Sequence, residues 1–531
     1  MIAVVDRDLK LLLRSRALSL LTQVNNFLAE QGIQAYIVGG FVRDLLLARD
    51  TADIDIALTA DALEIAPRVA TALGGRYIPL DKVNRVARVV VVNKEAPPNI
   101  GQWQLDFTTI KDSIEQDLKR RDFTIDAMAI DLKIVCQPQP LKLKKRGFAP
   151  PRLPILIDPF DGLNDLHQGV IRAVNEKAFV SDAARLLRAV RLASELGFTV
   201  SQETEALIRR HCHLIVGVAG ERVREELLRL LAAPQAGQLL RYLDDLGLLT
   251  TLIPELEPTK GVEQPREHFW DVFNHSIQAV TAVDFILRRG GWQYAGEEVL
   301  DFVPWSAELA QHFELKVSSG SSRRLLLKLA ALLHDIAKPQ TKAIDAQGRM
   351  RFFGHPREGE PIAASILERL RFSAKEVKLV ASIARYHLRP VQMSQNELPS
   401  HRAIYRYFRD TGDAAIDTLF FSLADHLATR GPNLDMADWQ EHARLIDHVL
   451  TQYFKQESVV APPKLIDGHD LINNFNLKPG PKIGEILEAV REAQASGEVS
   501  TRQEALSYVK DLLTSCRENP CQPSPKKELN M

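Results

Sequence analysis

The sequence has few cysteines and no long apolar run. The four cysteines in 531 residues are scattered and lack the spacing of a metal site: Cys136, Cys212, Cys516 and Cys521. This pattern predicts free thiols in a reducing compartment rather than a disulfide framework. No uninterrupted apolar run is long enough to span a membrane, and the charged residues within the first ten positions predict that no signal peptide is present. We therefore expect a cytoplasmic protein.

The chain also lacks an excess of charge of either sign. It has 67 Lys and Arg residues against 68 Asp and Glu residues, for a net charge of −1. A nucleic-acid partner would therefore have to contact a local basic surface rather than a basic whole. Hydrophobic residues make up 45% of the chain and charged residues 25%, which is ordinary for a globular protein. The length predicts about three or four domains.

A short apolar strand predicted at residues 36–38 leads into Gly39 and Gly40 and then into a predicted helix. Glycines let the backbone approach a phosphate closely, and the N–H groups at a helix start point toward it. Arg43, within the first turn, can bind the same phosphates. A tight structural turn explains this pattern alone equally well, because short motifs often occur without function.

The strand predicted at residues 53–58 carries Asp53 and Asp55 on one face, because side chains alternate across a strand. Two adjacent carboxylates repel each other unless cations neutralise them, and Mg²⁺ bridging to nucleotide phosphates meets that need. A solvated strand edge is the alternative. The order and close spacing of the two motifs favour a nucleotide-transfer site. Asp106, in a strand predicted at 102–110, is either a third carboxylate of this site or a strand-end residue.

Arg121 and Asp122 lie beside another apolar stretch. The arginine suits a triphosphate, and the aspartate can accept from a ribose hydroxyl, although a salt-bridged helix face is the alternative. A Pro-rich segment at 137–154 carries a basic cluster that either contacts RNA or is solvated. The alternation of strands and helices up to this point predicts an α/β or α+β domain.

From about residue 158 the pattern becomes helical. Asp182 is followed by arginines at every third position, including Arg185 and Arg188, on one gently drifting helix face. Arginines at this spacing are usually solvated, but after a phosphate-type domain they favour contact with nucleotide or RNA. Near the end of the chain, Pro479-Gly480-Pro481 predicts the start of a final helix at about 482–495.

A second group of residues has the side chains that bind metals. It consists of His275, His334, Asp335, His355, His387 and Asp425. A single histidine on a helix is usually a core residue, but six such positions in apolar helical surroundings are harder to explain that way. Imidazole and carboxylate together suit a divalent transition metal.

These motifs resemble the class II tRNA nucleotidyltransferase and bacterial poly(A) polymerase family over nearly the whole chain. The matching segments, in order, are Gly39-Gly40-Phe41-Val42-Arg43-Asp44 with Asp53-x-Asp55, Arg120-Arg121-Asp122-Phe123-Thr124-Ile125, Asp158-Pro159-Phe160-Asp161-Gly162, Ser181-Asp182-Ala183-Ala184-Arg185, and Glu221-Arg222 with Glu226. The region from His275 to Asp425 resembles an HD-type metal phosphohydrolase domain.

The resemblance implies an α+β protein with four parts. They are a nucleotidyltransferase head of mixed sheet and helices over 1–165, a helical neck over 166–258 that binds the base and RNA, an all-α HD-type domain over 259–455, and a helical tail over 456–531. It also implies catalysis by Mg²⁺ on Asp53 and Asp55, with the 3′ hydroxyl of tRNA attacking the α-phosphate of CTP or ATP.

The family's nucleotide-binding positions correspond here to Gly39, Gly40, Arg43, Arg121, Asp122, Asp182, Arg185 and Arg188. By the resemblance, Asp182 and Arg185 would read the base edge, and the protein would bind the 3′ end and acceptor arm of tRNA. The HD-type residues would hold a divalent transition metal and hydrolyse phosphoesters.

Two departures from the family pattern affect base choice. Ser181 stands where the family usually has a Glu that orients Arg185, and Asp126 stands where Asn is usual. The motifs do not separate a CCA-adding enzyme from one that adds only CC, only A or a long A tail. An HD-type phosphohydrolase with an inactive head is disfavoured by the intact carboxylate pair. A non-catalytic RNA-binding protein would not need two complete metal-binding groups.

Overall fold

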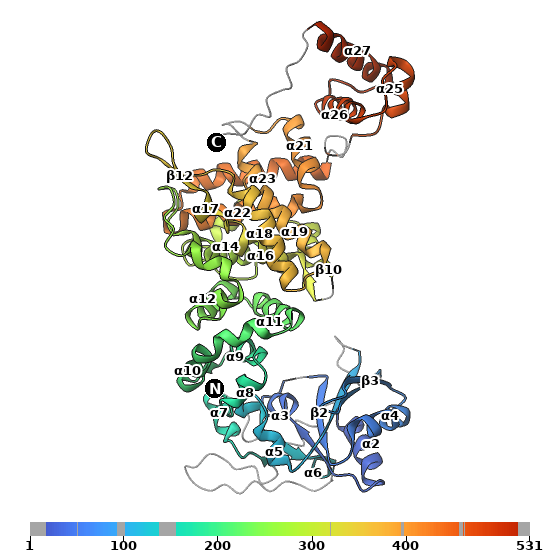
Figure 1. Cartoon of the computed structure of the whole chain (residues 1–531), viewed down its shortest axis with the longest axis vertical. Helices are drawn as coiled ribbons and strands as arrows, with labels where there is room; N and C mark the ends of the chain where they lie inside the picture. The colour runs from blue at the N-terminus through green and yellow to red at the C-terminus, as the bar shows by residue number, and fades with distance from the viewer. Residues whose placement is uncertain are drawn as a thin grey trace. The chain divides into compact units, whose positions relative to one another are not determined.

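The computed structural model describes residues 17–49, 51–92, 101–136, 156–318, 320–393, 398–455, 460 and 462–518. The basic segment at 137–154 lies outside these residues. The chain forms two compact units, one of residues 1–218 with 246–248 and one of 219–245 with 249–531 (Figure 1). The four-part division expected from the sequence stays a prediction. Among the described helices, none is both long enough and apolar enough to cross a membrane.

The first unit is built on a seven-stranded mixed sheet of order β3-β4-β5-β2-β1-β6-β7. Its strands are β1 (Ala35–Val38), β2 (Asp53–Leu58), β3 (Arg76–Asp81), β4 (Val86–Val91), β5 (Trp103–Thr109), β6 (Ala129–Asp131) and β7 (Leu156–Ile157). Only β2 and β5 pair in parallel, and the other neighbouring pairs are antiparallel. The expected mixed sheet is confirmed, and β2 lies near its centre.

Helices accompany the sheet and continue beyond it in the first unit. They are α2 (Ala17–Ala29), α3 (Gly40–Leu46), α4 (Ala62–Leu73), α5 (Ile114–Lys119), α6 (Leu132–Cys136), α7 (Gly162–Gln168), α8 (Lys177–Ser181), α9 (Ala184–Leu196) and α10 (Gln202–His211). Local signals set their ends. The Asp61 side chain accepts from the Leu63 N–H at the start of α4, and Gly74 ends that helix with a φ of 65°. A two-stranded parallel pair, β8 (Val170–Ile171) and β9 (Thr199–Val200), lies among the later helices.

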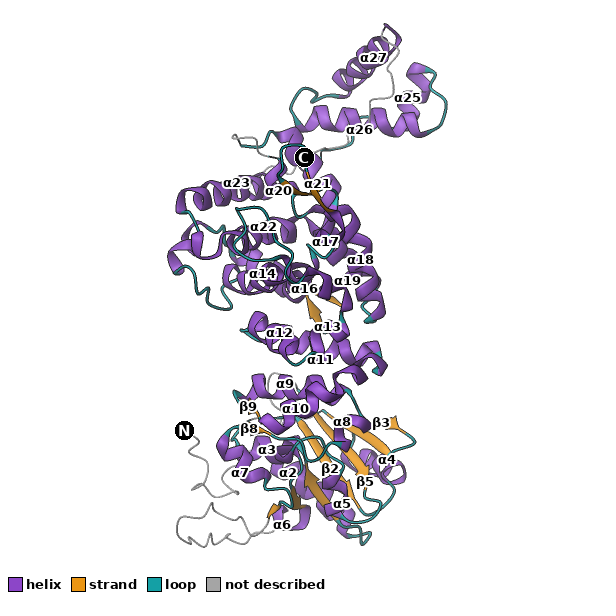
Figure 2. Cartoon of the chain, turned by 60° about the vertical axis from the view of Figure 1, so that its left-hand side comes forward, coloured by secondary structure: helices purple, strands orange, loops and turns teal. Residues whose placement is uncertain are grey.

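The second unit is mostly helical (Figure 2). Its longer helices up to residue 455 are α11 (Gly220–Ala232), α12 (Ala236–Asp245), α14 (Val272–Ile286), α15 (Ala307–Glu314), α16 (Arg323–Leu333), α18 (His355–Arg369), α19 (Ala374–Tyr386), α21 (His401–Thr411), α22 (Ala415–Arg430) and α23 (Met436–Lys455). Shorter ones are α13 (Leu248–Leu252), α17 (Lys338–Thr341) and α20 (Arg389–Gln392). Helices α14 and α22 are buried on nearly all sides, as central helices of a bundle must be. Two small hairpins, β10–β11 (Lys316–Ser318, Ser321–Ser322) and β12–β13 (Lys342–Ile344, Met350–Phe352), add strands that the all-α expectation for this region did not include.

The tail has a hydrophobic core of its own. It contains α25 (Gly468–Phe475), α26 (Pro481–Ala495) and α27 (Arg502–Glu518), packed around Leu471, Ile486, Val490 and Ala505. The helix expected at 482–495 is confirmed as α26, but it is not the final helix, because α27 follows it. The missed signal is a cap at Thr501, whose hydroxyl accepts from the Glu504 N–H while the Glu504 side chain accepts from the Thr501 N–H.

Candidate functional site

The two carboxylates on β2 have a third beside them. Asp53 is exposed and Asp55 is half-buried on the same face of the strand. Asp55 lies opposite Asp106 on β5, and Asp106 lies opposite Arg88 on β4. The Arg88 Nε and Nη2 atoms donate to the two Asp106 oxygens at 2.7 and 2.8 Å. Asp106 is therefore no strand-end residue; it neighbours Asp55 and is neutralised by Arg88.

Burial raises the pKa of Asp55 to about 6, against an ordinary value of 3.8. The nearby charge of Arg121 opposes this rise, and the carboxylates of Asp106 and Asp126 add to it. A desolvated carboxylate among other carboxylates is stabilised by a proton or by a cation. The residues present therefore fit a divalent cation at Asp53 and Asp55.

Gly39 brings Asp55 and Arg121 together. It precedes α3 with a φ of 71°, in the region that favours glycine. A Cβ atom at this position would lie 2.9 Å from Asp55 Oδ2 and would collide with the Arg121 guanidinium. The next residue, Gly40, begins α3, where a Cβ atom would be 3.4 Å from Arg43 Nη2. The glycine pair thus allows a carboxylate and a guanidinium to approach the backbone closely.

Arg43 is bound to carboxylates of the protein. Its Nη1 atom donates to Asp126 Oδ1 at 2.7 Å, and its Nε and Nη2 atoms donate to Asp44 at 2.9 and 3.0 Å. The side chain is buried, so in this arrangement it does not offer the free phosphate contact that the sequence suggests. Asp126, which replaces the usual Asn, supplies the charge that Arg43 needs in this position.

Arg188 joins α9 to the second motif. Its Nε atom lies 2.8 Å from Asp122 Oδ2, and its Nη2 atom lies 3.7 Å from Asp126 Oδ2. Burial alone would raise the pKa of Asp122, but the charges of Arg188 and Arg185 outweigh it and hold the pKa below the ordinary value. Asp122 is therefore ionised and paired with Arg188.

Asp182 and Arg185 meet at the junction between α8 and α9. Asp182 ends α8 in an extended conformation and accepts from the Ala184 N–H, while its Oδ2 atom is 3.8 Å from Arg185 Nε. The Arg185 Nη1 atom donates to the backbone carbonyls of Arg120 and Ala178 at 3.1 and 3.3 Å. Ser181 donates to the same Ala178 carbonyl. Backbone carbonyls thus hold Arg185 where the family uses a Glu side chain.

The six metal-type residues converge in the second unit. His275 lies on α14 and Asp425 on α22, whereas His334 and Asp335 follow α16, His355 begins α18 and His387 follows α19. Five of them are nearly inaccessible to solvent, and the Asp425 side chain is 21% exposed. We call these six residues the His/Asp cluster.

Backbone carbonyls orient three imidazoles of the cluster. The Nδ1 atoms of His334, His355 and His387 lie 2.9, 2.7 and 2.8 Å from the carbonyl oxygens three residues earlier. An Nδ1–H that donates to a carbonyl leaves Nε2 as a lone-pair donor, which is the usual arrangement of a metal ligand. The Nε2 atoms of His275 and His334 face each other at 3.2 Å, and those of His355 and His387 at 3.3 Å. Facing lone pairs repel unless a cation or proton lies between them.

Asp335 lies between two groups of candidate ligands, and the donor atoms within each group are within 4.8 Å of one another. Its Oδ2 atom is 3.0 Å from His334 Nε2 and 3.6 Å from His275 Nε2. Its Oδ1 atom is 3.3 Å from His355 Nε2 and 3.8 Å from His387 Nε2. Asp425 joins the first group, at 3.0 Å from His275. The chemistry and spacing of these donors fit two divalent ions sharing Asp335.

Charge is divided unevenly within the cluster. Burial alone would lower the pKa of His334, but the carboxylates of Asp335 and Asp425 raise it to about 10. Burial lowers the pKa of His387 to about 3, and the charges of His334 and His355 add to that effect. The carboxylates thus favour positive charge beside His334, which a proton or a bound cation can supply, while the surroundings of His387 favour a neutral imidazole.

Sequence reasoning missed residues around both sites. Lys338 lies with its Nζ atom 2.6 Å from Asp335 Oδ2 and 2.6 Å from Gln264 Oε1, and the His268 ring centroid is 5.4 Å from that of His275. The spacing of Lys338, three residues after Asp335 on a short helical turn, was a usable signal. Gln264 and His268 lie in the loop that leads into α14, shortly before His275, and no helical or strand spacing relates them to the other cluster residues.

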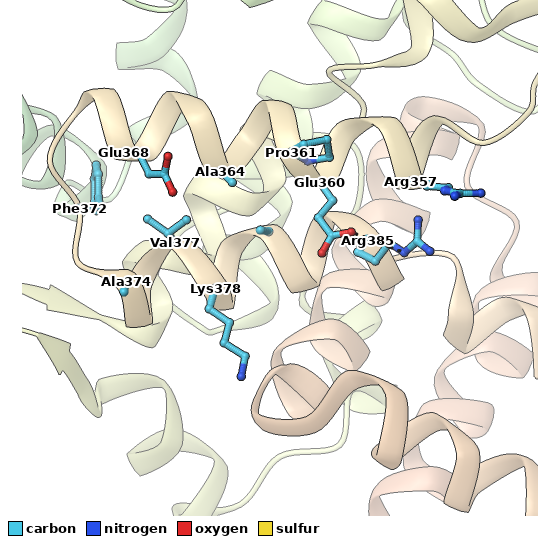
Figure 3. A pocket seen from close by; sticks show the side chains of 11 residues that line it. Arg357, Glu360, Pro361, Ala364, Glu368, Phe372, Ala374, Val377, Lys378 and Arg385 are labelled. Carbon is cyan, nitrogen blue, oxygen red and sulfur yellow. Dashed lines mark ion pairs between the residues drawn. The ribbon is translucent and has the colours of Figure 1, made fainter. Parts of the chain in front are cut away.

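A pocket of about 690 Å³ lies between α18 and α19, with Phe372 and Val377 at one end and Arg357 and Arg385 at the other (Figure 3). Although both helices contribute histidines to the His/Asp cluster, no cluster residue lines this pocket. The pocket is therefore separate from the candidate metal site.

Three family models match the chain. They are the poly A polymerase head domain over residues 35–172, the "Probable RNA and SrmB- binding site of polymerase A" over 197–260, and the tRNA nucleotidyltransferase domain 2 over 360–509. The chain is 33% identical to an A-adding tRNA nucleotidyltransferase of Deinococcus radiodurans, over 90% of this chain and 94% of the relative. It is 32% identical to a CC-adding tRNA nucleotidyltransferase of Thermus thermophilus, over 90% and 93%.

The fold is also similar to that of a solved Thermotoga maritima CCA-adding enzyme complexed with tRNA. The TM-score is 0.56 at 23% identity, and the match covers 96% of this chain and 99% of the other. This likeness concerns the fold alone.

Proposed function

Because the chain belongs to the tRNA nucleotidyltransferase family, we propose that it adds C and/or A nucleotides to the 3′ end of tRNA from CTP and ATP, releasing pyrophosphate. The observation that carries this proposal is the pair Asp53 and Asp55 on one face of β2, with Asp55 desolvated beside Arg121. Free and partly exposed thiols at Cys136 and Cys212 support a cytoplasmic location.

In the proposed reaction, Asp53 and Asp55 hold two Mg²⁺ ions. Bound there, the ions would lower the cost of ionising the attacking 3′ hydroxyl and stabilise the charge on the leaving pyrophosphate. Arg121 lies where its guanidinium can bind a triphosphate oxygen while Gly39 and Gly40 leave room for it. Arg43 supports this site indirectly, since it joins the α3 start to Asp126.

The base would be read by Asp182 and Arg185. Cytosine and adenine each present an amino donor beside a ring-nitrogen acceptor, which an Asp acceptor and an Arg donor complement. Uracil and guanine present a carbonyl where the donor should be, so a buried polar partner would be left unpaired. Asp122, which belongs to the motif at 120–125 and pairs with Arg188, is the proposed ribose contact. Nucleotide choice would then need no nucleic-acid template.

The family includes enzymes with different products. The sequence motifs alone put a CCA-adding enzyme first, with an A-adding, CC-adding or poly(A)-adding enzyme as alternatives. Relatives matched over 90% of the chain include one A-adding and three CC-adding enzymes, whereas a CCA-adding enzyme of Geobacillus stearothermophilus matches over 42%. These matches, with Ser181 in place of the usual Glu, favour a specialist over a complete CCA-adding enzyme.

One experiment separates these products. The purified protein is incubated with tRNA ending before the CCA, after C or after CC, with CTP and ATP supplied separately, and the products are sized. A CC-adding enzyme extends the shortest tRNA by two C residues only, and an A-adding enzyme adds one A to the tRNA ending in CC. A long ladder with ATP identifies a poly(A) polymerase. If no substrate is extended, the proposal is wrong.

A second activity is favoured by the His/Asp cluster. We propose that it binds two divalent transition metal ions and hydrolyses phosphoesters, such as a 2′,3′-cyclic phosphate on a damaged RNA end. Water would cleave the bond between phosphorus and the 3′ oxygen, leaving a 2′-phosphate and freeing the 3′ hydroxyl that the head could then extend. The facing Nε2 atoms and the central Asp335 support this proposal. Protein dialysed against Mn²⁺, Co²⁺ or Ni²⁺ should retain about two ions per chain and open a 2′,3′-cyclic nucleotide. If the protein retains no metal and hydrolyses no cyclic nucleotide, the proposal of a second activity is wrong.

A further inference from the structure

The tail contacts the rest of the second unit through the arginines of α21. The hydrophobic cluster of the tail draws its members from residues 465–513 alone, so it does not extend into α21. Helices α21 and α26 nevertheless lie against each other, as Figure 1 also shows. Among the described residues, the polar contacts between α21 and the tail include ion pairs, a contact with Ser496 and a hydrogen bond from Tyr405 to Glu488.

Three arginines form a stripe along one side of α21. Arg402, Arg406 and Arg409 occupy positions i, i+4 and i+7, which recur on the same face of a helix and span roughly 10 Å of its axis. The buried residues Ile404 and Phe408 anchor α21 through its other side. We call these three residues the arginine stripe.

Glutamates of the tail cover the arginine stripe. Arg406 Nε donates to Glu492 Oε1 at 2.8 Å, and its Nη2 atom donates to the other oxygen, so this pair is bidentate. Arg409 Nη1 lies 2.9 Å from Glu488 and 3.1 Å from Glu492. At the end of α26, Arg402 Nη2 lies 2.8 Å from Glu498.

Such a contact is well suited to exchange. The arginine side chains remain 37–48% exposed and their glutamate partners 16–52%. Ion pairs that stay partly exposed contribute modest net stability and weaken as salt screens them. A guanidinium binds a phosphate in the same forked geometry as a carboxylate. A polyanion has the further advantage that binding releases the counterions condensed on it. The stripe can therefore change partners without any loss of the tail's own core.

We propose that the arginine stripe is an RNA-backbone site that the tail occupies in the free protein. Glu488, Glu492 and Glu498 take the positions of phosphates, and RNA binding displaces them, so that the tail leaves α21. RNA as the ligand rests on the proposed tRNA nucleotidyltransferase function. Nucleotide addition to tRNA does not itself require that the glutamates of the tail cover the arginine stripe.

The test neutralises the covering carboxylates in the full chain. The double variant Glu488→Gln/Glu492→Gln should bind tRNA several-fold more tightly, because Arg406 and Arg409 lose the tail carboxylates that pair with them, while Arg402 keeps Glu498 and Arg409 keeps Asp410 of its own helix. Glu485→Gln is the matched control: it lies on the same helix, is exposed, and forms no ion pair with any residue that the structure describes. It removes the same kind of charge and should leave the affinity unchanged.

The arginines are tested through the salt dependence of binding. Arg406→Gln/Arg409→Gln should weaken tRNA binding and reduce the slope of log affinity against log salt by about 2, since each phosphate contact contributes about 0.9. Fluorophores placed at the exposed positions 375 and 510 report whether the tail leaves α21. Energy transfer should fall when tRNA is added to the parent protein and should be low in the double Gln variant without RNA.

The possible results distinguish the masked arginine stripe from the proposed tRNA nucleotidyltransferase function. Tighter binding by the double Gln variant together with the loss of energy transfer supports the masked stripe. Unchanged or weaker binding by that variant overturns it, with or without tail movement, because the glutamates then compete with nothing. A parent protein that binds no tRNA overturns the proposed function as well. Near-native thermal unfolding of each variant is required for these comparisons, and Arg406→Lys/Arg409→Lys replaces the Gln pair if that variant is unstable.

Discussion

The carboxylate pair of the head and the His/Asp cluster would offer a metal ion two different environments. On β2, Asp53 is exposed and Asp55 half-buried, and the surrounding cations are arginines. In the cluster, imidazoles and carboxylates from several helices enclose a nearly inaccessible centre. The first arrangement is incomplete without the phosphates of a nucleotide, as is usual for Mg²⁺. The second supplies a full set of ligands from the protein itself.

This difference also separates their expected functions. An open carboxylate pair beside Arg121 can bind metal and substrate together and release both after each reaction. Ligands held by backbone carbonyls, such as His334 and His387, are fixed before any substrate arrives. We therefore expect a substrate-dependent metal site in the head and a resident one in the cluster, and variants at one site should leave the other intact.

The largest expected effect is at the head. Asp55→Ala should reduce nucleotide addition on the order of a thousandfold or more, because losing a metal ligand removes several kcal/mol of transition-state stabilisation. Asp53→Ala should act similarly. Single-turnover extension of tRNA measures the rate, and metal content measures the cluster, which should not change. Near-normal addition by a well-folded variant would show that the metal assignment is wrong.

His334→Ala is the converse change. It should abolish metal retention and cyclic-phosphate hydrolysis by the second unit, since His334 is a candidate ligand of the first group together with Asp335. Nucleotide addition should stay within about twofold of the parent. His469→Ala, at an exposed histidine of the tail, is the control for loss of an imidazole. Equal metal content and hydrolysis in both variants would argue against the cluster as a metal site.

A smaller effect is expected at the base-reading residues. Arg185→Ala removes a donor that two backbone carbonyls hold in place, and each unpaired group costs about 1–3 kcal/mol. Incorporation should fall by roughly tenfold to a hundredfold, and discrimination against UTP and GTP should weaken. Competition between the four nucleotides measures both. Unchanged selection would mean that the base is read by other residues.

Ser181→Glu tests whether position 181 influences the choice between C and A. A Glu at this position could accept from Arg185 and would compete with the carbonyl of Ala178, which both Ser181 and Arg185 now use. The ratio of C to A incorporation should shift, while the total rate changes less than in Arg185→Ala. Ser181→Ala is the control, because it removes the hydroxyl without adding a carboxylate. The same C-to-A ratio in all three proteins would contradict a role for position 181 in base choice.

Much of the fold could be predicted from local patterns. The alternation in residues 53–58 agrees with β2 to the residue, and Asp61 and Gly74 mark the ends of α4 chemically. The break between α8 and α9 was not predicted. The regularly spaced arginines all lie in α9, after Asp182, so their periodicity carries no information about the turn that separates α9 from α8.

The site was predictable as a set of residues but not as a set of contacts. Residue types and order identified Asp53, Asp55 and the six cluster residues. Arg43 pairs with Asp126, which lies 83 residues further along the chain. This contact forms because the segment around residues 120–126 packs against α3, and no local sequence signal carries that information. The sequence left open whether Asp106 is a third carboxylate of the site or a strand-end residue. The strand register decides this, because it places Asp106 beside Asp55.

The smallest expected effect concerns stability and follows from the raised pKa of Asp55, about 6 in the folded protein against 3.8 ordinarily. Folding therefore favours the protonated form. The stability that this proton contributes is fully present below pH 3.8 and is lost as the pH rises through about 6. Asp55→Asn carries no charge, so above pH 6 the metal-free variant should be more stable than the metal-free parent, on the order of 1–3 kcal/mol.

Below about pH 4 the stabilities of Asp55→Asn and the parent should converge. Chemical unfolding in a chelator at pH 4, 5, 6, 7 and 8 measures this difference. Adding Mg²⁺ with CTP should reverse the order at pH 8, because ligands that bind only the folded parent stabilise it. Asp106→Asn is the control, since Arg88 already neutralises that carboxylate, and it should not become more stable with rising pH. An Asp55→Asn variant less stable than the parent at pH 8 without metal would mean that Asp55 is not strained by its burial, and that the open site on β2 needs no cation to balance it.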